Sequence, residues 1–299
     1  MKTKRVKAIA AGLTAVLLAG GILGGCGSDN TGSTAGQADA SAASGDTKVV
    51  KAVTGGSLAP YMYVDDNDEL TGVDIDILKE VFNRLPQYDL QIEIADALQG
   101  VLSGQYDIAV NNYGYTEERA ESYYFSYPYK TTYNVYIQRT DDEPLTSLQD
   151  IADRGYKIEL EAGGLTANAL EQWNEENPDH QIDIVYIETN FQVKFEHIVD
   201  GTTDLAIDDG PILDTLLEKF GLEGKLVGND IDDATQDFLF PHNNTYFLFG
   251  KNEEGAALRE DVDKVLKEMK EDGTLEKITT GYFGKDTSPK DEYFEETIN

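Results

Sequence analysis

The feature that most constrains the fold is an alternation of strands and helices that occurs twice along the chain. Short runs rich in Val, Ile and Leu alternate with segments whose apolar residues recur at the spacing of one helical face. Such an alternation is typical of α/β lobes with largely parallel sheets. The expected strands are 48–53, 90–94, 107–110, 156–160, 182–187 and 204–207, and the expected helices are 73–85, 97–102, 166–177 and 191–200.

The length of 299 residues predicts two lobes of ordinary domain size. A short helix is expected to begin in the second stretch, with Thr146 or Ser147 as its cap. A C-terminal helix is expected at 258–269, stopped by the glycine of the pair Asp272-Gly273. Nothing beyond Lys285 is expected to fold.

The charge of the chain excludes one large class of partners. It has 24 Lys and Arg residues against 56 Asp and Glu residues, which gives a formal net charge of −32. A surface of this sign repels a phosphate backbone, so we expect no nucleic-acid partner. The apolar content of 40% is that of a folded globular protein.

The sequence offers little for binding a metal, and we expect neither a metal nor a cofactor. An acidic run at 65–69 could suggest a calcium loop, but Leu70 stands where such a loop needs glycine, so we expect a solvated hairpin turn. The histidines have no ligand-like spacing, and the one cysteine cannot form a thiolate cage. These residues are His180, His197, His242 and Cys26.

The first residues predict export. Residues 1–25 combine a basic start with an apolar stretch, which is typical of a signal peptide. The alternative is an N-terminal membrane helix, because the stretch is near the lower length limit for spanning a membrane. The run Leu-Gly-Gly before Cys26 resembles the bacterial lipobox, whose cysteine receives lipid and becomes the new N-terminus. Residues 26–47 are then expected to form the lipidated cysteine and a flexible linker, with the protein anchored to the outer face of the cell membrane.

Three motifs at matching distances resemble the bacterial extracellular solute-binding proteins of family 3, which deliver polar amino acids to ABC importers. The first is the run LTGVDIDI at 70–77. The second combines LSGQYD at 102–107 with TEER at 116–119 and FSYPY at 125–129. The third combines DGTLEKI at 272–278 with YFG at 282–284.

The resemblance implies a two-lobed α/β fold of the periplasmic-binding-protein type II, with a central ligand cleft and two crossover segments. The crossings are expected near Lys130 and His242. Lobe 1 would then comprise 48–130 and 243–286, lobe 2 would comprise 131–242, and 287–299 would be a tail. The implied protein is a monomer whose partners are an amino acid and an ABC permease in the membrane.

A zwitterionic ligand needs two anchors of opposite sign, because each of its buried charges must meet an opposite charge. Arg119 matches the family arginine that binds the ligand carboxylate, and a surface salt bridge with Glu117 or Glu121 is the structural alternative. Asp209 takes the place of the family aspartate that binds the ligand ammonium group. Asp209 could instead cap the next helix, and the adjacent Asp208 could exchange roles with it.

The resemblance implies further ligand contacts on both lobes. Gly164 and Thr166 match the family motif G-x-T, which supplies donors to the carboxylate, and a capping role for Thr166 is the alternative. Because Gly163 precedes Gly164, the motif can be aligned on either glycine, which leaves its register undecided by one residue. The other implied contacts come from lobe 1 and are a backbone N–H at Asn112 and at Gly114, and the side chains of Leu58 and Tyr61.

Three details bear on specificity. Gly114 lacks the hydroxyl that relatives often place there, so that contact is lost or comes from Asn111 or Asn112. Leu58 and Ile94 stand where many relatives have aromatic residues. The pair Asn111-Asn112 is similar to cystine-type receptors, so a cystine-like amino acid is included among the expected ligands.

Two other functions fit the same fold. An enzyme such as a dehydratase would need a positioned acid or base, and the three histidines form no such constellation. A surface sensor would use the cleft for signalling. The expected function is therefore a binding protein that performs no catalysis.

Overall fold

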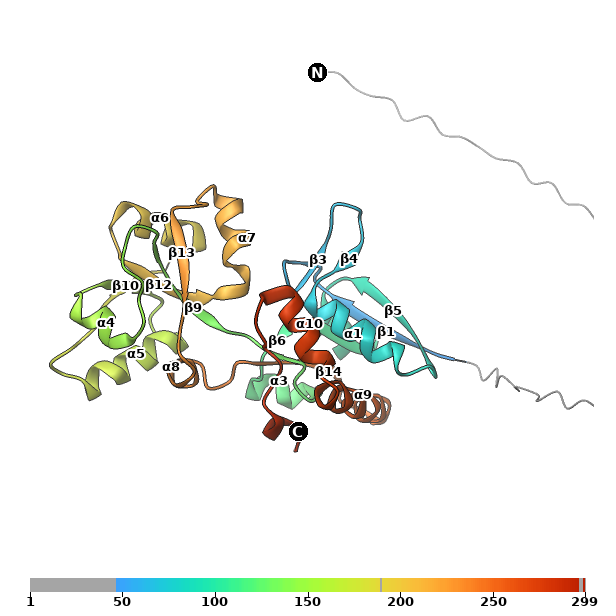
Figure 1. Cartoon of the computed structure of the whole chain (residues 1–299). Coiled ribbons are helices and arrows are strands. Elements are labelled where there is room, and N and C mark those ends of the chain that lie inside the picture. Colours follow the sequence, from blue (N-terminus) through green and yellow to red (C-terminus); the bar gives the residue numbers. More distant parts are fainter. Residues whose placement is uncertain (1–46, 189, 296–297, 299) are drawn as a thin grey trace, which may run out of the picture. The chain divides into compact units, whose positions relative to one another are not determined.

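The computed structural model describes residues 47–188, 190–295 and 298 (Figure 1). The expected signal peptide at 1–25, Cys26 and nearly all of the linker lie outside the described residues. Within the described part of the chain, no helix has the length and apolar character needed to cross a membrane.

The first lobe is built around a sheet with the strand order β5-β1-β6-β14-β7, and β8 pairs with β14 beside it. The strands β5, β1 and β6 run parallel, whereas β14 is antiparallel to β6 and to β7. Its strands are β1 (Lys48–Thr54), β5 (Tyr88–Ile94), β6 (Ile108–Tyr113), β7 (Tyr123–Phe125), β8 (Lys130–Thr131) and β14 (Asn244–Gly250).

The second lobe repeats this plan in a sheet with the order β11-β10-β12-β9-β13. The strands β11, β10 and β12 run parallel, and β9 is antiparallel to β12 and to β13. Its strands are β9 (Asn134–Arg139), β10 (Lys157–Leu160), β11 (Asp183–Tyr186), β12 (Leu205–Asp209) and β13 (Leu226–Asp230).

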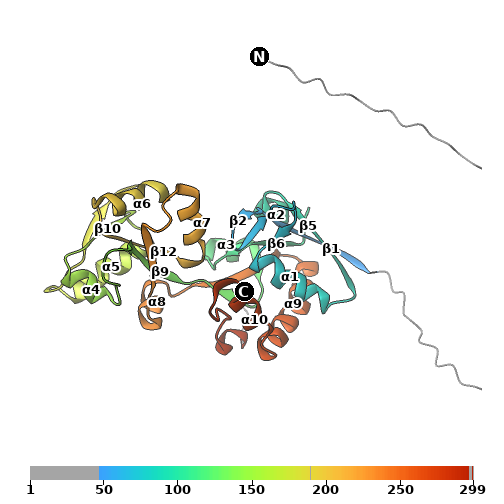
Figure 2. The same ribbon diagram turned by 45° about the horizontal axis from the view of Figure 1, so that its top comes forward.

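Helices follow the parallel strands in both lobes, so the predicted α/β class and two-lobed fold are confirmed (Figures 1 and 2). Those of the first lobe are α1 (Val73–Asn83), α2 (Ala97–Leu102), α3 (Glu117–Ser122), α9 (Glu253–Glu271) and α10 (Thr274–Phe283). Those of the second lobe are α4 (Leu148–Asp153), α5 (Leu165–Glu176), α6 (Phe191–Asp200), α7 (Gly210–Phe220) and α8 (Asp233–Leu239). Ser147 caps α4, and α2 and α6 have the expected bounds.

Strand periodicity explains how each sheet is covered on both faces. Along β6, Ile108 and Val110 belong to a core that includes residues of α1 and α9, whereas Ala109 belongs to a core that includes residues of α2. Along β12, Ile207 packs in the core beside α5, and Ala206 packs in the core beside α6 and α7. Because successive strand residues point to opposite faces, each central strand supports two cores at once.

The acidic run expected to be a hairpin turn is one. It connects β3 (Met62–Val64) to β4 (Leu70–Thr71), and these strands form a small antiparallel sheet with β2 (Ser57–Leu58). The Asp65 side chain accepts hydrogen bonds from the backbone N–H groups of Asn67 and Glu69, which accounts for the turn without a calcium ion.

The chain passes between the lobes along two adjacent segments. Thr131 of β8 pairs with Asn244 of β14, and the next residue, Thr132, donates its backbone N–H to the Asn243 carbonyl oxygen at 2.8 Å. β8 leads into β9 of the second lobe, and α8 leads back into β14 of the first. The backbone hydrogen bonds hold these two segments together where the lobes meet.

The expectation that nothing folds beyond Lys285 is wrong. A short 3₁₀ helix spans Asp291–Phe294. The Phe294 ring is buried in the core that includes residues of α1 and α9, and its centroid lies 5.5 Å from that of the Tyr127 ring. The Thr287 carbonyl oxygen accepts the Thr131 backbone N–H at 2.7 Å. The segment has too little hydrophobic periodicity to be recognised locally, and it is ordered by surfaces that only the folded first lobe provides.

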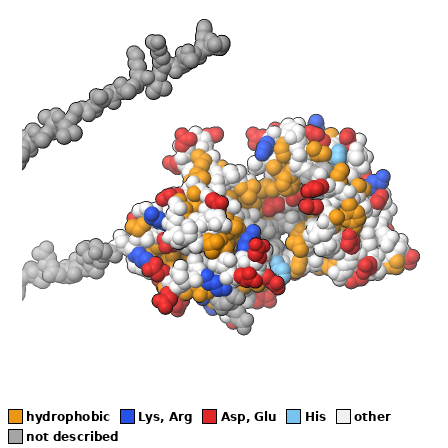
Figure 3. All heavy atoms as spheres, turned by 180° about the vertical axis from the view of Figure 1, so that it is seen from behind, with side chains coloured by type: hydrophobic (Ala, Val, Ile, Leu, Met, Phe, Trp, Pro, Cys, Tyr) orange, Lys and Arg blue, Asp and Glu red, His pale blue; other side chains and the backbone are white. Residues whose placement is uncertain are grey.

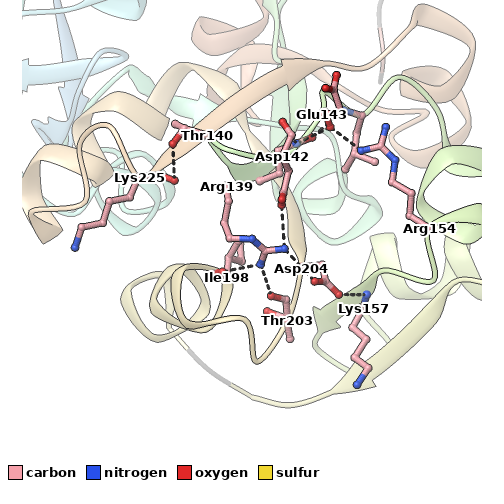
Figure 4. A network of polar contacts seen from close by, with 12 residues as sticks. Arg139, Thr140, Asp142, Glu143, Arg154, Lys157, Ile198, Thr203, Asp204 and Lys225 are labelled. Carbon is pink, nitrogen blue, oxygen red and sulfur yellow. Dashed lines mark hydrogen bonds and ion pairs between the residues drawn. The ribbon is translucent and has the colours of Figure 1, made fainter.

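Arg139, at the end of β9, organises one end of the second lobe (Figure 4). Its guanidinium donates hydrogen bonds to the carbonyl oxygens of Ile198 and Thr203 and forms ion pairs with Asp142 and Asp204 at 2.9 and 3.1 Å. One side chain therefore connects β9 to α6 and to the loop that enters β12.

Replacing Arg139 with Met is expected to lower the free energy of unfolding by about 1–3 kcal/mol, because two partly buried carboxylates and two carbonyl groups lose a charged donor. Urea denaturation monitored by circular dichroism measures the change. The control is Arg154→Met, since Arg154 donates mainly to the Glu143 and Pro144 carbonyl groups of one exposed loop. An equal effect of both substitutions would contradict the role given to Arg139.

Candidate functional site

Asp209 is the last residue of β12, and its side chain caps α7. Its carboxylate accepts the Ile212 backbone N–H at 3.3 Å, and a proline follows in the first turn of the helix. Burial raises the pKa of Asp209 to about 6. The helix capping expected as the alternative is confirmed, and it leaves other lone pairs of the carboxylate for further partners.

The partner of Asp209 in the other lobe is Tyr61. The Tyr61 hydroxyl lies 2.8 Å from each carboxylate oxygen of Asp209 and donates its proton to them. Tyr61 is only 1% exposed, and it sits in the turn between β2 and β3. This hydrogen bond joins the two lobes at the position expected for the ligand ammonium group.

A fully buried ion pair lies beneath Tyr61. The Lys130 ammonium group is 3.1 Å from the Asp74 carboxylate, and both side chains are completely buried. Burial raises the pKa of Asp74 and lowers the pKa of Lys130, while their mutual attraction acts in the opposite direction. Lys130 also lies 4.3 Å from the centre of the Tyr61 ring and donates to Thr245 at 3.1 Å.

Asn112 supports this ion pair, and its expected contact with the ligand stays a prediction. That N–H donates to the Asp74 carboxylate at 2.9 Å, and the Asn112 side-chain oxygen accepts a hydrogen bond from Lys130. Its φ angle of 52° lies in the left-handed region, where asparagine is among the best tolerated residues. Both the backbone and the side chain of Asn112 therefore contact the buried charges.

Arg119 lies on α3, near the end of β6. Its guanidinium donates to the Gly114 carbonyl oxygen at 2.8 Å and lies 5.2 Å from the centre of the Tyr113 ring. Across the described part of the chain, Arg119 forms no ion pair with Glu117, Glu121 or Asp209, so the surface salt bridge is not formed. Since a guanidinium has five N–H groups, most remain available for a carboxylate.

Gly114 therefore contributes through its carbonyl group, which orients Arg119. A Cβ atom at Gly114 would have only the Asn244 carbonyl oxygen near it, at 3.9 Å, so the space beside this glycine is open. Ligand contact through its backbone N–H stays a prediction.

A cavity of about 200 Å³ opens on the second lobe beside the starts of α5 and α6. Gly164 is the N-cap of α5. Because glycine has no side chain, no side-chain group caps the backbone N–H groups in the first turn of this helix. Thr166 is the second helical residue, so the expectation that it caps the helix is wrong, because the helix starts one residue earlier than its apolar spacing suggested. The cavity is lined by residues that include Gly164, Leu165, Thr166, Lys194 and Asp208.

Asp208 is committed to Lys194, which the sequence analysis did not identify. The two charged groups are 3.0 Å apart, and the other Asp208 oxygen accepts the Asp209 backbone N–H. The pairing gives the adjacent aspartates different partners, since Asp209 faces Tyr61. The spacing from Lys194 to Asp208 contains no helical or strand repeat that could have revealed the pair.

Apolar side chains stand at the corresponding edge of the first lobe. Leu58 is 38% exposed and accepts the Tyr61 backbone N–H with its carbonyl oxygen, and Ile94 is 52% exposed at the end of β5. Figure 3 shows a hollow between the lobes with hydrophobic and acidic atoms along its walls. Ligands of open α/β sheets bind in this setting, at the carboxyl ends of the strands.

Residues 47–188, 190–295 and 298 contain no group of three His, Cys, Asp or Glu side chains arranged to hold a metal ion.

Of the expected site residues, the structure places Tyr61 against Asp209, Gly114 against Arg119, and Gly164 and Thr166 in one cavity.

Comparison with known proteins identifies several relatives. The chain is 28% identical over 276 residues to the Bacillus subtilis protein named "Probable amino-acid-binding protein YxeM", covering 92% of this chain and 94% of the relative. It is 27% identical to the L-cystine-binding protein TcyK of the same organism, covering 80% and 85% of the two chains.

Solved structures share the fold. One comes from a study of glutathione import through GshT and the cystine ABC importer TcyBC of Streptococcus mutans, with 28% identity, a TM-score of 0.58, and coverage of 83% of this chain and 99% of the other. The open, unliganded L-cystine solute receptor of Neisseria gonorrhoeae has a TM-score of 0.61 at 21% identity, with coverage of 82% and 97%. The family model of the bacterial extracellular solute-binding proteins, family 3, matches residues 50–285. The chain belongs to this family.

Proposed function

We propose that this protein is the substrate-binding component of an ABC importer and that it binds a polar or cystine-like amino acid between its lobes. Arg119 binds the ligand carboxylate together with the free N–H groups in the first turn of α5, which begins after Gly164 and includes Thr166, and Asp209 binds the ammonium group. The protein delivers the amino acid to a membrane permease and performs no catalysis.

The observation that carries this proposal is the Asp209 carboxylate. It is largely buried, its pKa of about 6 leaves it charged at neutral pH, and it faces the other lobe through the Tyr61 hydroxyl. A buried carboxylate that stays ionised is an effective partner for a cationic group. The L-cystine-binding name of one relative supports an amino acid as the ligand.

The proposal includes the arrangement of the lobes and the anchor. The lobes comprise 48–130 with 243–286 and 131–242, and they move about the paired segments that contain Thr131 and Asn244. Residues 1–25 act as an export signal, and lipidation of Cys26 anchors a monomeric protein to the outer face of the membrane.

The test is a thermal-shift screen of the twenty amino acids and cystine. A ligand at 100 times its Kd adds about 2.7 kcal/mol to stability, which corresponds to a rise of roughly 5–10 °C in Tm for a chain of this size. The methyl ester and the N-acetyl derivative of the best ligand are controls, because each lacks one of the two required charges. Absence of a shift with every amino acid would refute the proposal, and a change in ligand mass after incubation would indicate an enzyme instead.

A further inference from the structure

Several charged and polar groups surround the Asp209 carboxylate, which is the proposed ammonium site. Asp209 faces Tyr61 from the first lobe, Lys130 from β8, Asp208 from its own strand, Tyr133 from the crossing segment and the backbone N–H of Ile212. Burial and the Asp208 charge favour the protonated carboxyl group. Tyr61, Lys130 and the Ile212 N–H favour the charged carboxylate, which is the form that an ammonium group needs.

Tyr61 is held in place through both its backbone and its ring. Its carbonyl oxygen accepts the Asp74 backbone N–H at 3.0 Å, and Gly72 packs so closely that a Cβ atom there would lie 2.4 Å from this oxygen. The ring lies over the Lys130 ammonium group on one side and meets the edge of Phe283, with ring centres 6.1 Å apart. The ring, and with it the hydroxyl, therefore has little freedom to move within the first lobe.

Lys130 has no exposed surface, so its role is inside the protein. Its ammonium group is held by the Asp74 carboxylate and by hydrogen bonds to Asn112 and Thr245. These partners come from α1, β6 and β14, which makes the position of the cation independent of any single element. A cation over an aromatic face stabilises the ring where it stands.

We propose that Tyr61 and Lys130 are positioning residues of the ammonium site. Lys130 holds the Tyr61 ring, and the Tyr61 hydroxyl orients the Asp209 carboxylate toward the ligand ammonium group. This inference rests on the proposed function, and it gives Tyr61 a role through Asp209 in place of the direct ligand contact expected from the sequence.

The first test is Tyr61→Phe, which keeps the ring and removes the hydroxyl. Calorimetry with the ligand found in the thermal-shift screen is expected to show about ten- to a hundredfold weaker binding at pH 7.5, the cost of one hydrogen bond to a charged group. Because binding needs the charged carboxylate, wild-type affinity falls as the pH drops through about 6. In the variant this loss is expected to begin at a higher pH.

Two further variants separate positioning from general damage. Tyr133→Phe removes a hydroxyl from a tyrosine that also faces Asp209 but makes no hydrogen bond to it in the described structure, so its pH profile should match the wild type. The double variant Lys130→Met with Asp74→Asn removes both buried charges, which avoids leaving either unpaired. In this double variant, as in Tyr61→Phe, the loss of binding on acidification is expected to begin at a higher pH.

The titration of the Asp209 carboxyl carbon, followed by NMR in ligand-free protein, is a readout independent of binding. It should move to higher pH in Tyr61→Phe and stay in place in Tyr133→Phe. An unchanged titration and affinity in Tyr61→Phe would overturn the positioning role while amino-acid binding by the wild type still supports the proposed function. A wild-type protein that binds no amino acid would refute the proposed function, and the positioning role with it.

Discussion

Replacing Asp209 with Asn is expected to weaken amino-acid binding by about 2–5 kcal/mol, or roughly thirtyfold to several thousandfold, because the ligand ammonium group would be buried without a counter-charge. The side-chain oxygen of asparagine can still accept the Ile212 N–H, so the α7 cap survives. Isothermal titration calorimetry at pH 7.5 with the ligand identified by the thermal-shift screen measures the loss.

The same substitution is expected to stabilise the ligand-free protein. The pKa of Asp209 is raised to about 6 from its ordinary value of 3.8, so the folded protein binds this proton more tightly than the unfolded chain does. This side chain therefore lowers stability as the pH rises from about 4 to about 6, and it remains unfavourable at neutral pH. A neutral asparagine removes that cost, and Tm without ligand should rise while binding is lost.

Asp208→Asn is the matched control, since the neighbouring carboxylate pairs with Lys194 and not with Tyr61. It should change affinity much less than Asp209→Asn does. A loss of binding in Asp208→Asn combined with retention in Asp209→Asn would reverse the assignment of the ammonium site.

Replacing Arg119 with Ala is expected to cost about 2–5 kcal/mol of binding free energy, because the ligand carboxylate would lose its cationic partner in the closed cleft. Arg119→Lys should recover only part of the loss, since an ammonium group cannot make two parallel hydrogen bonds to a carboxylate. Calorimetry under the same conditions compares the variants.

The fold should tolerate this change. Arg119 donates its side-chain hydrogen bond to the Gly114 carbonyl oxygen, and no ion pair within the described residues depends on it. Urea denaturation should therefore show a change in unfolding free energy of less than about 1.5 kcal/mol. Arg154→Ala, at the end of α4 in the second lobe, is the control for removal of an arginine. Unchanged affinity in Arg119→Ala would remove this residue from the site.

The candidate site was partly predictable because its residues lie in motifs that resemble those of the family. Asp209 stands at the end of a strand recognisable from its apolar run, and motifs at matching distances drew attention to Arg119. The structure added that Asp209 caps α7 and that Arg119 is oriented by Gly114. The roles expected for both residues came from the resemblance of these motifs to the family, and the apolar run added that Asp209 follows a strand.

The buried ion pair was not predictable in the same way. Asp74 belongs to a helix whose apolar face is evident, and Lys130 follows a run of aromatic residues, but nothing local distinguishes a buried charge from a solvated one. The pair forms because the fold brings Asp74 of α1 beside Lys130 of β8, and the Asn112 backbone N–H supports it.

Hydrophobic periodicity within single segments was sufficient to predict the alternation of strands and helices and the α/β class, because it acts over a few neighbouring residues. The two lobes were predicted from the chain length and from the resemblance to the family. Tertiary packing alone decided which charges meet. Tyr61 and Asp209 are 148 positions apart, and Phe294 is ordered against a core that forms elsewhere in the chain. Pairing and burial depend on such distant segments, so they became visible only once the chain was folded.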